Sequence, residues 1–76
     1  MSKHHPELLA EIEAFVADAG MSEITFGRRT MSDPHFVRDI RNGRRLWPET
    51  VDKLHKRMVI VADEVAAARQ AGAEAA

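Results

Sequence analysis

Apolar residues recur at spacings of three and four in separate stretches of the chain, and this spacing predicts an all-α fold of four helices in a single domain. The first helix is expected to begin at Pro6, because proline suits the first turn of a helix, and to end at Gly20. Acidic residues occupy its opposite side. Its apolar positions are Leu8, Leu9, Ile12, Phe15, Val16 and Ala19.

A second, short helix is predicted from Ser22 to about Arg29. The Ser22 hydroxyl is suited to accept a backbone N–H bond as its N-cap. With barely two turns this helix needs tertiary packing to persist. We expect Ile24 and Thr30 to face inward beside Phe26.

A third helix is predicted over residues 34–42. Asp33 followed by Pro34 favours a helix start, because the carboxylate caps free N–H groups and proline lacks the donor that the first turn leaves unused. Gly43 is expected to end this helix.

The side chains of the third helix divide into two faces. Val37 and Ile40 are one turn apart and face the core. Phe36 lies between the two faces, so it is either a core residue or a base contact. The positions directed away from the core are Pro34, His35, Arg38, Asp39 and Arg41.

A long fourth helix is predicted over about residues 48–71, after which the chain should fray. Trp47, just before it, is expected to pack between the third and fourth helices. The alternatives for Trp47 are a stacking platform and a phosphate contact from its indole N–H. The apolar residues of the fourth helix form the heptad seam Val51, Leu54, Met58, Val61, Val65 and Ala68. A second side is also apolar, through Val59, Ile60, Ala62 and Ala66. The chain is too short to cover both sides, which favours a homodimer with the contacts Met58, Val61, Val65 and Ala68.

Basic residues gather in the middle of the chain, although the net charge of the whole is −1. Residues 28–57 contain nine of the eleven Lys and Arg and only four acidic residues, so this segment carries +5 and the remainder −6. Association responds to the local field of such a patch more than to the sum over the chain. The charge segregation therefore favours a nucleic-acid partner.

Composition argues against several other classes of protein. A chain of 76 residues without cysteine has no thiolate nucleophile, disulfide framework or thiolate zinc site, which fits a reducing cytoplasm. No apolar run approaches the ~18 to 20 residues that a membrane span requires. Ser32, Asp33 and His35 are too close along one helix to form a hydrolytic triad. We expect a cytoplasmic protein at the nucleoid, with no catalytic residue, metal or cofactor.

The segment from Glu23 to Gly43 resembles the helix-turn-helix of the lambda-repressor-like family, which includes phage repressors and related bacterial regulators. The family pattern is an apolar residue and an alanine, a turn glycine, a capping residue, a buried pair, and a closing glycine with basic residues. Laid on this chain without gaps, these positions are Phe26, Gly27, Met31, Asp33, Val37, Ile40, Gly43, Arg44 and Arg45. Pro48-Glu49-Thr50 matches the opening of the next helix.

Two positions depart from this pattern. Gly27 replaces the alanine at the helix contact, and Met31 replaces the glycine that would adopt a left-handed conformation at low cost. The turn geometry is therefore less secure than the family's, and a turn built differently would tilt the third helix.

The resemblance implies that the third helix enters the major groove with its N-terminal part at the base edges. Arg38 can then pair bidentately with guanine, Asp39 can accept from a cytosine amine or hold Arg38 in place, and Phe36 can touch a thymine methyl group. The implied base contacts are His35, Phe36, Arg38 and Asp39. The implied phosphate contacts are Arg28, Arg29, Arg41, Asn42, Arg44 and Arg45.

These features together predict a sequence-specific regulator of transcription that binds double-stranded DNA as a homodimer. The alternative is a protein-interaction module, in which the same helices bind RNA polymerase or a second regulator and the arginines meet an acidic surface. Charge alone does not separate the two.

Overall fold

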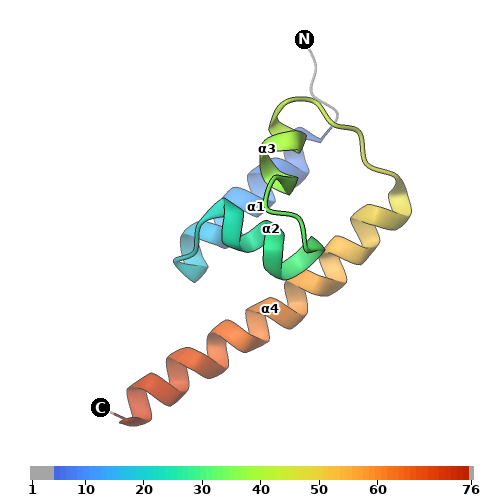
Figure 1. The fold of residues 1–76 in the computed structure, drawn as a ribbon. Helices are drawn as coiled ribbons and strands as arrows, with labels where there is room; N and C mark the ends of the chain where they lie inside the picture. Colours follow the sequence, from blue (N-terminus) through green and yellow to red (C-terminus); the bar gives the residue numbers. More distant parts are fainter. Residues whose placement is uncertain (1–4, 76) are drawn as a thin grey trace.

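The computed structural model describes the backbone of residues 5–75 and the side chains of residues 5–72. Within that range the chain forms four helices and no strand, which confirms the all-α prediction (Figure 1). The helices are α1 (Pro6–Ala19), α2 (Glu23–Met31), α3 (Phe36–Arg41) and α4 (Pro48–Ala75). None of these helices is long and apolar enough to cross a membrane.

Local capping chemistry sets the boundaries of α1 and the start of α2. Gly20 follows α1 in a left-handed conformation, with φ of 71°. The amides of Gly20 and Met21 both donate to the Val16 carbonyl, which satisfies the end of the helix. Ser22 caps α2 as predicted, because its hydroxyl oxygen accepts a 3.1 Å bond from the Thr25 amide.

The other boundaries differ from the prediction by a few residues. The helix α2 continues to Met31, and α3 begins at Phe36 because Pro34 and His35 form a turn ahead of it. The carboxylate of Asp33 still accepts a backbone bond, from the His35 amide at 2.9 Å. The helix α4 does not fray at residue 71 but continues to Ala75.

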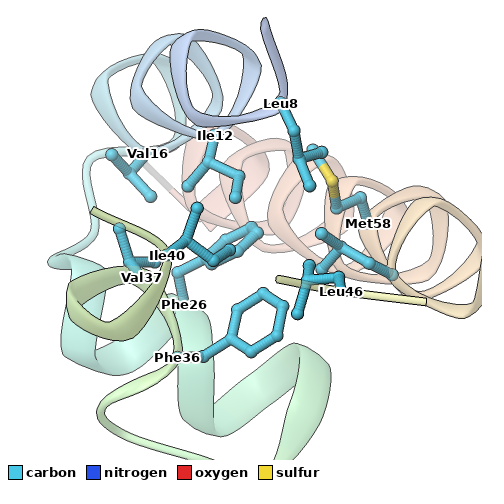
Figure 2. Packing of buried hydrophobic residues seen from close by; sticks show 10 residues of the cluster. Leu8, Ile12, Val16, Phe26, Phe36, Val37, Ile40, Leu46 and Met58 are labelled. Atoms are coloured by element: carbon cyan, nitrogen blue, oxygen red, sulfur yellow. The ribbon is translucent and has the colours of Figure 1, made fainter. Parts of the chain in front are cut away.

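A small core forms where the four helices meet (Figure 2). Val37 and Ile40 are buried, as predicted. Thr30 is buried too, and its hydroxyl donates to the Phe26 carbonyl at 2.7 Å. The apolar core residues are Leu8, Ile12, Val16, Phe26, Phe36, Val37, Ile40, Leu46, Leu54 and Met58.

Two apolar residues predicted to be inside are exposed. Ile24 is about 200° around the helix from Phe26, so it points to solvent when Phe26 points inward. Trp47 is 71% exposed, because its neighbour Leu46 takes the place in the core. The prediction that Trp47 packs between α3 and α4 is therefore wrong.

The heptad seam of α4 is covered by the chain itself. Leu54, Met58 and Val61 are buried, and α4 packs chiefly on α2. Val65 is only partly buried and Ala68 is exposed. The prediction that Met58 and Val61 contact a second subunit is wrong, because both side chains already lie inside one chain.

Candidate nucleic-acid interface

The turn between α2 and α3 is closed by backbone bonds. The amides of Ser32 and Asp33 donate to the carbonyls of Arg28 and Gly27, each at 3.1 Å. Ser32 adopts the left-handed conformation, with φ of 55°, one residue later than Met31, which aligns with the family's turn glycine. Met31 itself is helical. The departure at Met31 therefore moves the left-handed residue instead of abolishing the turn.

Gly27 lets this turn approach α2 closely. A Cβ atom at this position would overlap the carbonyl oxygen of Asp33 and lie 3.3 Å from its carbonyl carbon. Both atoms belong to the backbone, so a side-chain rotation cannot make room. Glycine is thus required where the family pattern has alanine, and the path of the chain into α3 depends on it.

The helix α3 presents a narrow outward side. Three of its six residues, Phe36, Val37 and Ile40, are buried against the core. The Arg38 side chain is 64% exposed, and its Nε lies 3.9 Å from Asp39 Oδ1. His35 is exposed just before the helix. The outward side therefore presents three of the four predicted base contacts.

Phe36, the fourth predicted base contact, is a core residue. Its side chain is 1% exposed and cannot reach a base edge. The core alternative is therefore the correct one, and the base-contact prediction for Phe36 is wrong. Phe36 is the first residue of the six-residue helix α3, so its buried ring anchors the N-terminal end of that helix.

Arg44 links the segment after α3 to the turn before it. Its guanidinium lies 5.9 Å from the centre of the Phe36 ring. Its Nη1 is 3.5 Å from Asp33 Oδ2 and 3.6 Å from Asp39 Oδ2. These are long, exposed contacts, which contribute little stability and exchange readily for another anion.

Arg41 and Arg29 are held by acidic residues of other helices. Arg41 makes bonds of 2.5 and 2.6 Å to the two carboxylate oxygens of Glu23 and a bond of 2.7 Å to Glu13. Arg29 bonds to Glu64 of α4 at 2.6 Å. We correct their assignment from phosphate contact to helix pairing, because both guanidiniums are directed at carboxylates of the same chain.

The ion pair of Glu23 and Arg41 makes stability depend on pH. Hydrogen bonds from Arg41 lower the pKa of the Glu23 carboxyl below its ordinary value of 4.5. A lowered pKa stabilises the fold above the unfolded value and loses that contribution as pH falls through the folded value. We expect the free energy of unfolding to fall between about pH 5 and pH 3, with about 1 kcal/mol or less from this half-exposed pair.

Urea unfolding of the wild type and Glu23→Gln at several pH values measures this contribution. Glu23→Gln should be less stable at pH 7 and should lose less stability on acidification. Asp52→Asn removes one exposed carboxylate that has no ion pair among the described residues, and it should keep the wild-type slope. An unchanged slope in Glu23→Gln would contradict the assignment.

The remaining predicted phosphate contacts stay free of the core. Arg28, Asn42 and Arg45 are exposed, and no ion pair in the described part of the chain involves Arg28 or Arg45. Trp47, two residues after Arg45, adds an exposed aromatic ring, and the alternative of a phosphate contact from its indole N–H stays a prediction. The only sequence signal for this exposure was that adjacent residues of an extended segment point in opposite directions. That signal did not say whether Leu46 or Trp47 enters the core.

The candidate interface is therefore the outward side of α3 with the residues before and after it. It comprises Arg28, His35, Arg38, Asp39, Asn42, Arg44 and Arg45. Comparisons of the chain with family models, with curated proteins and with solved structures gave no match.

Proposed function

We propose that this chain is a sequence-specific, double-stranded DNA-binding regulator of transcription that acts as a homodimer at the nucleoid in the cytoplasm. In this proposal α2, the turn and α3 work as a helix-turn-helix of the lambda-repressor-like kind. The observation that carries the proposal is the short helix α3, which is anchored by three buried residues and directs Arg38 to solvent.

The chemistry of the outward residues fits base and phosphate recognition. An arginine guanidinium matches the O6 and N7 acceptors of guanine in the major groove. Asp39, beside Arg38, is suited to hold that guanidinium or to accept from a cytosine amine. Arg28, Arg44, Arg45 and Asn42 supply backbone contacts, which fix the position of a protein on the duplex.

Duplex DNA suits this surface better than a single strand. Proteins that bind single strands stack successive bases on exposed aromatic rings. Phe26 and Phe36 are buried, and Phe15 packs edge-on against Phe26 with ring centres 5.5 Å apart. Trp47 alone remains as an exposed Phe or Trp ring among the described residues. One ring does not form a stacking platform.

A salt titration on duplex DNA tests the proposal. Arg29 and Arg41 are engaged inside the chain, so the predicted phosphate contacts that remain as cations are Arg28, Arg44 and Arg45. Arg38, the predicted base contact, is the fourth cation of this surface in each subunit. The logarithm of the binding constant should then fall with the logarithm of salt concentration with a slope of about −3 to −4 per subunit. Selection from a random duplex pool should yield a preferred inverted repeat. Absence of duplex binding, with binding to RNA polymerase or another regulator instead, would support the protein-interaction alternative.

Two arginines should have separable effects on DNA binding. Arg38→Ala should weaken the selected site by about 1 to 3 kcal/mol and relax the sequence preference at one position. Arg45→Ala should weaken selected and random duplexes alike and reduce the salt slope by about one. Arg69→Ala is the control, since Arg69 is not part of the candidate interface and pairs with Asp18 in the last turn of α1. Equal loss of specificity in the Arg38 and Arg45 variants would contradict the division of roles, and fluorescence anisotropy measures all three.

A further inference from the structure

We propose that a second copy of this chain docks antiparallel on the outer face of α4, with Val59 and Ile60 at the centre of the contact. The outer face is the side of α4 opposite its buried seam and includes Lys53, Lys56, Val59, Ile60, Asp63 and Ala66. This inference rests on the homodimer in the proposed function and assigns its surface and register.

The outer face has an apolar centre that nothing in the described chain covers. Val59 and Ile60 are 64% and 54% exposed. They lie on the side of α4 that points away from Leu54, Met58 and Val61, which face the core. The C-terminal end of α4 also extends beyond the other three helices (Figure 1).

Charges on either side of this centre are complementary under one symmetry only. Lys56 precedes Ile60 by one helical turn, and Asp63 follows Val59 by one turn. A two-fold axis between Val59 and Ile60 makes the helices antiparallel, so Lys56 of each copy lies opposite Asp63 of the other. A parallel pair would instead set Lys56 against Lys56 and Asp63 against Asp63, which is unfavourable.

The ion pairs of α4 support this division of its surface. His55, Glu64 and Arg69 pair with Glu11, Arg29 and Asp18 of the same chain. No ion pair within the described residues involves Lys56 or Asp63. These three charges are thus used within the chain, and Lys56 and Asp63, which flank Val59 and Ile60, are left for a partner.

Charge reversal tests the register without DNA. Sedimentation equilibrium of the full chain should show a dimer with a micromolar dissociation constant, as suits a small interface. Lys56→Asp and Asp63→Lys each place like charges opposite one another twice per dimer, and each should raise the dissociation constant about tenfold or more. The double variant restores opposite charges and should return the constant to near the wild-type value. Lys53→Asp makes the same charge change opposite the small, neutral Ala66 and should have a smaller effect.

Circular dichroism checks that each variant remains folded. We expect folded variants, because Lys53, Lys56 and Asp63 are all exposed. A wild type that stays monomeric at about 100 µM overturns the inference. A double variant that associates no better than the single variants also overturns it. DNA binding is measured separately, so failure of that binding with intact association removes the regulator proposal and leaves the interface.

Discussion

Gly27→Ala should destabilise the fold more than any other single methyl addition at a described glycine. The added Cβ would overlap the Asp33 carbonyl oxygen, and relief requires the turn or α2 to move. Overpacking of this kind costs about 1 to 3 kcal/mol and occasionally more. A chain of this size has a small core, so the loss should lower the urea midpoint strongly. Urea unfolding followed by circular dichroism measures it.

Gly72→Ala is the matched control for that substitution. Gly72 also lies within a helix, but a Cβ there meets nothing within 4 Å. Alanine favours the helical state over glycine by up to about 1 kcal/mol, so this variant should be neutral or stabilised. Similar stabilities for the two variants would show that the turn does not close on Gly27. Any Gly27→Ala protein that remains folded should also bind DNA weakly, since α3 follows directly from the displaced turn.

Phe36→Ala should cost about 3 to 5 kcal/mol of unfolding free energy, because it removes a fully buried ring from a small core. Marginal domains have about 5 kcal/mol or little more, so we expect this variant to be largely unfolded at 37 °C. Phe36→Leu keeps most of the volume and should remain folded. Thermal unfolding followed by circular dichroism compares the two.

The same position separates packing from base recognition. Phe36→Leu should bind the selected duplex with unchanged sequence preference, because a buried ring makes no base contact. Trp47→Ala is the stability control: it removes a larger ring that is exposed, and should change stability by only about 0.5 kcal/mol. Altered base preference in Phe36→Leu, with α3 still formed, would show that the ring reaches the groove.

Some elements follow from short-range chemistry, and for these the sequence was sufficient. Pro6 and Gly20 bound α1, Ser22 caps α2, and Val37 with Ile40 form the inward pair of α3. Each of these depends on residues no more than four positions apart, because caps and helical periodicity are local. The all-α class follows from the same periodicity.

The sequence was less informative about tertiary contacts, where the same residue type and spacing suit more than one neighbour. The spacing of Met58 and Val61 shows that one side of α4 is covered, but the same spacing suits contact with α2 or with another subunit. The family resemblance implied a phosphate contact for Arg41. Its long side chain reaches Glu13 and Glu23 instead, and those residues come close only when α1, α2 and α3 pack together.

The amino-acid sequence by itself determined four helices, both ends of α1, the starts of α2 and α4, and the concentration of positive charge around α3, because these depend on local bonding and on composition. Tertiary structure alone decided that Phe36 is buried, that Trp47 is exposed, and that Gly27 admits the turn. The physical reason is steric and electrostatic: which side chain fills a space, and which cation meets which carboxylate, depends on distances between helices that are far apart in sequence.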